Sequence, residues 1–135
     1  MKLVADEPGA KLPAYQTLGS AGADLHALLY KPLPIPPGSR SLVRTGVRVV
    51  DMRECDCLLV LPRSGLAKDG LSVVTGLIDS DYEGEVLVLV HNISSMEHTI
   101  HPGERIAQLL YCPIQRIPGL EVGGDRNGGH GSTGR

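Results

Sequence analysis

A short acidic segment holds the residues best suited to chemistry. Asp79, Asp81 and Tyr82 lie between Gly76 and Gly84. Apolar residues precede this segment, and a run of valine and leucine follows it, so the pattern predicts a β-hairpin with buried arms and an acidic tip. Carboxylates and a phenol on rigid arms could handle protons at a bound substrate. Taken alone, the segment fits a simple polar turn better, because Asp and Ser are ordinary turn residues.

A second segment suits an anionic ligand. Arg63, Ser64 and Gly65 follow residues 54–61, which have the pattern of a strand buried on both sides. A helix of one or two turns is predicted next, capped by Ser64 and ended by Gly70. N–H groups at a helix start favour an anion, and Arg63 adds positive charge. A capped helix with a solvated arginine is the alternative interpretation.

Two weaker features also fit a phosphorylated ligand. Gln108 lies within an otherwise apolar strand pattern, where its amide needs hydrogen-bond partners. The glycine-rich tail carries Arg126 and the hydroxyl of Ser132, and it has the composition of a loop that wraps around phosphates. A disordered terminus is the usual alternative for such a composition.

Carboxylates near a polyphosphate usually either hold Mg²⁺ or accept a proton from attacking water. Asp24, Asp79 and Asp81 are the candidates, and Asp24 stands among small residues that indicate close backbone packing. The sequence shows no Ser-His-Asp or Cys-His order around a nucleophile elbow. Direct attack of water on phosphorus is therefore favoured over a covalent intermediate.

Short strands must position these residues. The chain has 135 residues, of which 41% are hydrophobic, and it contains 17 glycines and 10 prolines but neither Phe nor Trp. This composition favours tight turns, short strands and an aliphatic core in one domain. Five or more strands with regular turns predict an all-β sandwich, barrel or jelly roll. We expect a catalytic domain over residues 1–118 and a separate tail segment over residues 119–135.

Charge and cysteine content exclude several classes of protein. The net charge is −2, with both signs mixed along the chain, so no global field would recruit nucleic acid or an anionic membrane. No apolar segment is long enough to span a membrane, and the N-terminus lacks a signal-peptide pattern, so we expect a cytoplasmic protein. Three cysteines without framework spacing argue against a disulfide scaffold. Cys55 and Cys57 are predicted to be core residues.

The order of these pieces resembles the homotrimeric dUTP diphosphatase (dUTPase) family. That family has five short motifs, and each has a match here in the same order. The matching segments are Ala21–Leu25, Pro62–Ala67, Gly76–Glu85, Gly103–Leu109 and Gly128–Gly134. The resemblance implies a jelly-roll-like distorted barrel with one short helix, as the subunit of a threefold trimer whose active sites are shared between chains. It also implies hydrolysis of dUTP to dUMP and diphosphate with Mg²⁺, which keeps uracil out of DNA and supplies dUMP for dTMP synthesis.

The resemblance also implies roles for single residues. Asp79 would be the general base for the water that attacks the α-phosphorus, Tyr82 would lie under the deoxyribose, and Asp24 would hold Mg²⁺ through bound water. The remaining contacts fall to Arg63, Ser64, Gly65 and Gln108 for the phosphates, to the backbone near Val73, Gly76 and Ile78 for uracil, and to Arg126, His130, Gly131 and Ser132 in a tail that closes as a lid.

Two departures from the family pattern fall in the tail. The family usually has Phe where this chain has His130, and its tail arginine usually lies five residues earlier, where this chain has Asp125. Arg126 is therefore one residue late. We expect His130 to stack on uracil and Arg126 still to reach the phosphates, because the surrounding glycines let the backbone absorb the shift.

Two other functions fit parts of the pattern. A dCTP deaminase shares the fold, but it would need a Glu base and different contacts to the cytosine amine. A trimeric module that only senses nucleotide would keep the fold without catalysis. The segment from Asp79 to Tyr82, together with Gln108, favours the diphosphatase over both.

Overall fold

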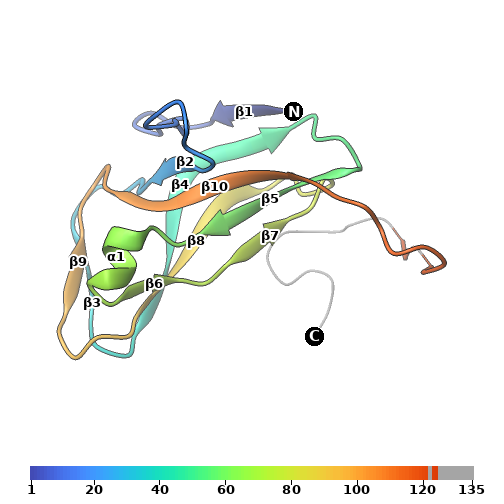
Figure 1. Cartoon of the computed structure of the whole chain (residues 1–135). Helices are drawn as coiled ribbons and strands as arrows, with labels where there is room; N and C mark the ends of the chain where they lie inside the picture. Colours follow the sequence, from blue (N-terminus) through green and yellow to red (C-terminus); the bar gives the residue numbers. More distant parts are fainter. Residues whose placement is uncertain (122, 125–135) are drawn as a thin grey trace.

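The structure is a computed structural model, and it describes residues 1–121, 123 and 124. The described chain forms short strands and one helix (Figure 1). In chain order these are β1 (Lys2–Ala5), β2 (Ala23–His26), β3 (Leu33–Ile35), β4 (Arg40–Val50), β5 (Asp56–Leu61), α1 (Ser64–Lys68), β6 (Leu71–Val73), β7 (Gly76–Ile78), β8 (Glu85–Asn92), β9 (His98–Ile100) and β10 (Arg105–Pro113).

Two four-stranded antiparallel sheets form the body of the molecule. One has the strand order β1-β4-β8-β6 and the other β2-β10-β5-β7, while β3 and β9 pair as a separate ribbon. The predicted all-β class with one short helix is confirmed, and the two four-stranded sheets agree with the predicted jelly-roll-like arrangement. No helix in the described part of the chain has the length and apolar character of a membrane span.

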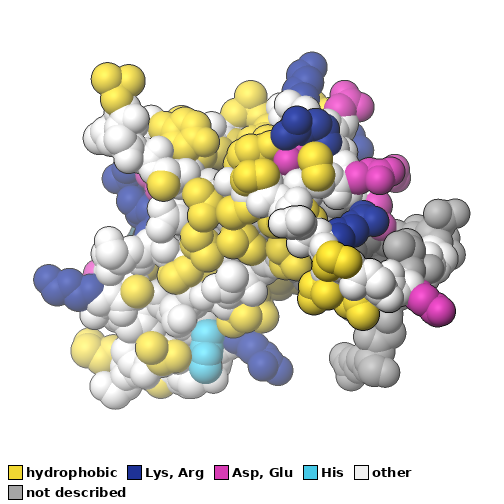
Figure 2. Space-filling model, turned by 45° about the vertical axis from the view of Figure 1, so that its right-hand side comes forward, with side chains coloured by type: hydrophobic (Ala, Val, Ile, Leu, Met, Phe, Trp, Pro, Cys, Tyr) yellow, Lys and Arg dark blue, Asp and Glu magenta, His cyan; other side chains and the backbone are white. Residues whose placement is uncertain are grey.

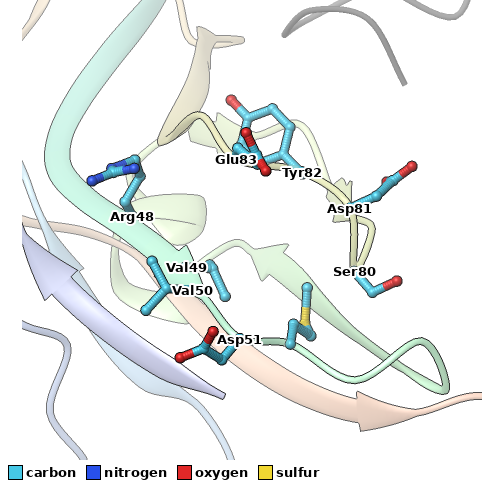
Figure 3. A pocket seen from close by; sticks show the side chains of 9 residues that line it. Arg48, Val49, Val50, Asp51, Ser80, Asp81, Tyr82 and Glu83 are labelled. Atoms are coloured by element: carbon cyan, nitrogen blue, oxygen red, sulfur yellow. The ribbon is translucent and has the colours of Figure 1, made fainter. Parts of the chain in front are cut away.

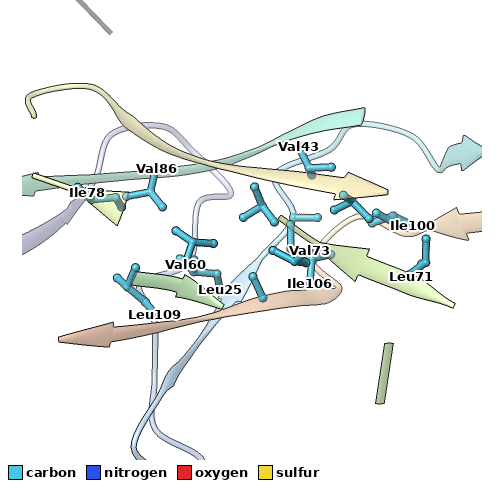
Figure 4. Packing of buried hydrophobic residues seen from close by; sticks show 14 of the residues in the cluster. Leu25, Val43, Val60, Leu71, Val73, Ile78, Val86, Ile100, Ile106 and Leu109 are labelled. Atoms are coloured by element: carbon cyan, nitrogen blue, oxygen red, sulfur yellow. The ribbon is translucent and has the colours of Figure 1, made fainter. Parts of the chain in front are cut away.

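An aliphatic core fills the space between the two sheets (Figure 4). Val43, Val86 and Val88 project from β4 and β8, while Leu25 and Ile106 project from β2 and β10 in the opposite sheet; all five are at most 1% exposed. Burial of this apolar surface is the main force that holds the sheets together. Because the core is rigid, it fixes where the loops at the sheet edges begin and end.

The predicted acidic hairpin is only partly correct. Its outer arms do pair, since β6 joins β8 with Val73 opposite Val90. Between these arms, however, the chain crosses to the other sheet, where β7 pairs with β5 and Ile78 lies opposite Leu58. The acidic segment is therefore a connection between two sheets, because Ile78 buries its side chain in the shared core.

Two smaller predictions are also wrong. Ser64 is the first residue of α1, and Arg63 occupies the N-cap position without a side-chain capping bond. Cys57 is buried, as predicted, but Cys55 is exposed because it precedes the start of β5 at Asp56. Gly70 follows α1 with a φ of +89°, a left-handed conformation suited to glycine, and so ends the helix as expected.

Candidate active site

Asp24 and two arginines form an ion-paired cluster at one end of the second sheet. The Nε of Arg63 donates to Asp24 Oδ1 at 2.9 Å, and Nη1 of Arg105 donates to Asp24 Oδ2 at 3.2 Å. Arg63 also donates through Nη1 to the carbonyl oxygen of Arg105 at 3.0 Å. The Asp24 side chain is 8% exposed and that of Arg63 is 26% exposed. The cluster therefore fixes the Arg63 guanidinium while leaving part of it open to a ligand.

Strand pairing brings Gln108 to the same place. Gln108 lies opposite Asp24 on β2 and opposite Leu61 on β5, and its Nε2 donates to the carbonyl oxygen of Pro62 at 2.8 Å. Gly22 makes this approach possible, since a Cβ at that position would lie 2.5 Å from the amide oxygen of Gln108. The close backbone packing expected around Asp24 is confirmed here.

We call the resulting depression the Arg63 pocket. It has a volume of about 270 Å³ and is lined by Gln16, Ser20, Ala21, Gly22, Asp24, Arg63, Ser64, Gly65 and Gln108. The sequence-predicted phosphate residues Arg63, Ser64, Gly65 and Gln108 therefore meet in one chain. Helix α1 is only five residues long, so its dipole adds little and Arg63 dominates the positive charge of the pocket.

The described residues do not form a metal site on their own. None of their His, Cys, Asp or Glu side chains gather in a group of three or more that could hold an ion. Both carboxylate oxygens of Asp24 accept bonds from arginines, which place positive charge where Mg²⁺ needs negative charge. Direct coordination by Asp24 therefore does not fit. Contact through water, as predicted, would leave the metal held mainly by phosphate oxygens of a substrate.

The Asp79 loop, residues 79–84, connects β7 to β8. Tyr82 closes a turn by donating its N–H to the carbonyl oxygen of Asp79 at 3.1 Å, and its hydroxyl donates to the carbonyl oxygen of Glu85 at 2.8 Å. Ser80, Asp81, Tyr82 and Glu83 line one side of an open pocket of about 390 Å³, and the end of β4 with Asp51 and Met52 lines the other. Figure 3 shows the Tyr82 ring turned away from the side on which Asp81 points out.

Strand β7 offers backbone groups beside this loop. It is the last strand in its sheet, with Gly76 opposite Val60 on β5, so its other edge presents N–H and C=O groups outward. The side chains of Val73 and Ile78 are buried, and only backbone atoms of these predicted uracil residues can meet a ligand. A rigid backbone edge of this kind can distinguish the hydrogen-bonding face of a base.

The Arg63 pocket and the Asp79 loop lie apart within one chain. Continuing the register of Leu58 opposite Ile78 places Asp79 beside Cys57, at the start of β5, whereas Arg63 follows the end of β5. Six residues of strand span about 20 Å. Figure 1 shows the same separation, with α1 beyond one end of β5. The structure therefore brings four predicted residues together and keeps Asp79 and Tyr82 away from them.

Other site residues fall outside these two groups. Arg126, His130, Gly131 and Ser132 lie outside the described residues. Sequence reasoning gave no role to Arg105, which holds Asp24, or to Glu85, which accepts the backbone bonds described below. An arginine or glutamate at the first position of a strand carries no signal by itself, because its partners come from distant parts of the chain.

Comparison with known proteins shows the family of this chain. The dUTPase family model matches residues 9–134. The deoxyuridine 5'-triphosphate nucleotidohydrolase of Aeromonas hydrophila is 45% identical over 132 residues, which cover 92% of this chain and 87% of that protein.

Solved structures give the same result for the fold. The dUTPase of Streptococcus mutans superposes with a TM-score of 0.74 at 29% identity, covering 87% of this chain and 98% of that one. A mutant dUTPase of phage phi11 of S. aureus, studied for its coordination of a structural Mg(II) ion, has a TM-score of 0.78 at 20% identity over 90% of this chain and 95% of its own. The match extends across nearly the whole chain and covers both the Arg63 pocket and the Asp79 loop, so the chain belongs to the dUTPase family.

Proposed function

We propose that this protein hydrolyses dUTP to dUMP and diphosphate as a homotrimer. The observation that supports this most directly is the separation of two complementary half-sites, the Arg63 pocket and the Asp79 loop, at opposite ends of β5. The Arg63 pocket has the positive charge for a triphosphate. The Asp79 loop has a carboxylate and lies beside the β7 backbone edge, which can recognise uracil. A neighbouring chain must supply the missing half, and threefold symmetry lets every chain give and receive one.

The Arg63 pocket binds the triphosphate. Arg63 is held by Asp24 through Nε and by the Arg105 carbonyl through Nη1, so its guanidinium meets phosphate oxygens in a fixed orientation. Ser64 and Gly65 add a hydroxyl and backbone N–H groups, and the Gln108 amide contacts phosphate beside them. Preorganised donors of this kind stabilise the charge that develops on the phosphates during reaction.

The β7 edge and the Asp79 loop bind the nucleoside. Backbone groups from Val73 to Ile78 read the uracil edge, and their anchoring in the core leaves no space for a thymine methyl group. Tyr82 lies under the deoxyribose and excludes a 2′-hydroxyl. Its ring is held by the bond from its own hydroxyl to the Glu85 carbonyl, so it cannot move aside without breaking that bond.

Asp79 acts as the general base. Its carboxylate takes a proton from a water molecule, which then attacks the α-phosphorus, and diphosphate leaves on the opposite side. Mg²⁺ would be held by the triphosphate, with Asp24 contacting it through water, and it would neutralise part of the phosphate charge. The β7 edge fixes the uracil on one side and the Arg63 pocket fixes the phosphates on the other. Together they orient the α-phosphorus against Asp79.

An apolar outer face supports the trimer. Leu59, Leu77 and Leu110 lie side by side on the face of the second sheet that points away from the core, and Leu77 is 61% exposed. Figure 2 shows hydrophobic side chains gathered across the middle of one face of the molecule. An exposed apolar area of this kind is typical of a protein interface.

Substrate selectivity tests the proposal. Incubation with dUTP, dCTP, dTTP or UTP in the presence of Mg²⁺ should release diphosphate rapidly from dUTP alone, with kcat/KM at least roughly a hundredfold lower for the others, because each carries one group that the site excludes or fails to bond. Diphosphate release and deaminated product are measured in parallel. Equal turnover of dUTP and dTTP would refute the proposal, and deamination of dCTP would move the chain to the related deaminase activity.

The tail gives a separate prediction. His130→Ala should raise KM for dUTP clearly, because a stacked ring is worth roughly 1–3 kcal/mol per base, while His130→Phe should keep most activity. Arg126→Ala should lower kcat more than it changes KM, because an arginine on the phosphates helps most in the transition state. Steady-state kinetics measure both. If both alanine variants behave like the parent, the tail is not a lid, and Arg135 becomes the next candidate.

This activity removes dUTP before it can enter DNA and supplies dUMP as the precursor of dTMP. We place it in the cytoplasm, where dUTP and the other DNA precursors would be available to it. The same proposal requires no contact with nucleic acid or membrane, because the substrate is a free nucleotide.

A further inference from the structure

We propose that Glu85 is a positioning residue that sets discrimination against ribonucleotides by holding Tyr82 in place. This inference rests on the proposed function, in which Tyr82 lies under the deoxyribose. Glu85 is the first residue of β8 and directly follows the Asp79 loop. It does not need to touch the substrate, because it acts through the tyrosine.

The Glu85 carboxylate accepts three hydrogen bonds from β4. Its Oε1 accepts N–H bonds from Thr45 at 3.0 Å and from Gly46 at 2.6 Å, and its Oε2 accepts a bond from Nε of Arg44 at 2.9 Å. The side chain is 22% exposed. Several charge-assisted bonds converge on one partly buried carboxylate, which fixes the first residue of β8 against β4.

A bulge in β4 creates this acceptor site. The register between β4 and β8 shifts between Arg44 and Arg48, and Gly46 has a φ of +67°. This conformation turns two successive N–H groups towards one carboxylate, as in other anion-binding backbone turns. A Cβ at Gly46 would lie 2.6 Å from the Cβ of Ala10, so the bulge depends on glycine for space as well as conformation.

Tyr82 is attached to the same residue. Its hydroxyl donates to the Glu85 carbonyl oxygen at 2.8 Å, and its ring lies over Gly84, where a Cβ would be 2.5 Å from the hydroxyl oxygen. The ring therefore rests on the short segment between the loop and β8. Anchoring of the Glu85 side chain on the bulge fixes the backbone carbonyl that holds the tyrosine.

Loss of this anchor should affect sugar selectivity more than binding in general. A shift of the ring by about 1 Å is enough to change a rate by up to roughly a hundredfold when geometry is critical. A displaced ring would make room for a 2′-hydroxyl and would also pack less well on the deoxyribose. The ratio of kcat/KM for dUTP to that for UTP should therefore fall.

The experiment measures this ratio in the full-length protein for Glu85→Ala, Tyr82→Phe and the double variant. The ratio does not depend on the fraction of active protein, so a variant that is only less stable leaves it unchanged. We expect the ratio to fall by about tenfold in each single variant and by no more than this in the double variant. The reason is that both changes remove the same support, by which Glu85 holds the Tyr82 ring. If the ratio in the double variant falls by the product of the two single-variant factors, the inference is contradicted.

Two further variants sharpen the result. Glu7 also pairs with Arg44, whereas the N–H groups of Thr45 and Gly46 bond to Glu85, so Glu7→Gln serves as the matched control and should leave the ratio unchanged. Glu85→Gln keeps an oxygen for Thr45 and Gly46 but loses the charge and the acceptor for Arg44, so it should lower the ratio by about threefold. This variant tests the inference if Glu85→Ala does not fold. An unchanged ratio in the glutamine and alanine variants that fold would overturn the inference. A parent enzyme that does not select dUTP would instead refute the proposed function.

Discussion

Asp79→Asn should lower kcat for dUTP by about 10²–10⁴-fold while dUTP still binds. The amide has nearly the same shape as the carboxylate, so contacts to the sugar and base remain, but it cannot accept a proton from water. Steady-state kinetics give kcat, and calorimetry with a non-hydrolysable dUTP analogue gives affinity. The expected result is a large loss in kcat with little change in Kd, which is the pattern of an interaction made only during reaction.

The neighbouring carboxylate provides the matched control. Asp81 belongs to the same loop, and its side chain points away from the Tyr82 ring (Figure 3). Asp81→Asn removes the same charge from the same region and should change kcat far less than Asp79→Asn. A near-normal kcat in Asp79→Asn would place the base elsewhere, and a larger loss in Asp81→Asn would point to that carboxylate.

The sequence was sufficient to predict the fold class because the relevant signals are local. Along β8 valine and leucine alternate, and the valines are buried while the leucines are only partly buried. Glycine and proline mark the turns that separate the short strands. The path of residues 76–78 could not be predicted in the same way. A run of three residues has the same pattern whether it pairs with β8 or crosses to β5, and pairing with β5 is decided by the burial of Ile78 in the shared core.

The candidate site shows the same division. The residue types near Arg63 and Asp79 indicated phosphate and proton chemistry, and the family resemblance supplied their roles. Sequence reasoning did not reveal that Asp24 is already paired with two arginines, because Arg105 is 81 positions away along the chain and meets it only through the pairing of β2 with β10. This pairing adds a second role to Asp24, which orients Arg63 and leaves contact with a metal to bound water.

Mixed trimers should recover activity that neither parent variant has. Asp79→Asn lacks the base, and Arg63→Ala should lose at least roughly a hundredfold in kcat/KM through loss of a charge on the phosphates. Suppose that each site takes Asp79 from one chain and Arg63 from another. With equal amounts and random assembly, each of these two residues is intact in half of the sites, so both are intact in one quarter of them. Co-expression of the two variants should therefore restore about one quarter of parental activity.

The recovery depends on the two residues belonging to different half-sites, so a pair from one half-site is the control. Arg63 and Gln108 both line the Arg63 pocket. When Arg63→Ala and Gln108→Ala are co-expressed, every Arg63 pocket lacks one of these two side chains. No activity should be restored, although the trimers assemble equally well. If Asp79→Asn and Arg63→Ala also fail to complement in trimers shown by light scattering to be mixed, both residues act within one chain. The loop and the pocket would then have to move together across the length of β5, which its rigid pairing with β7 and β10 opposes.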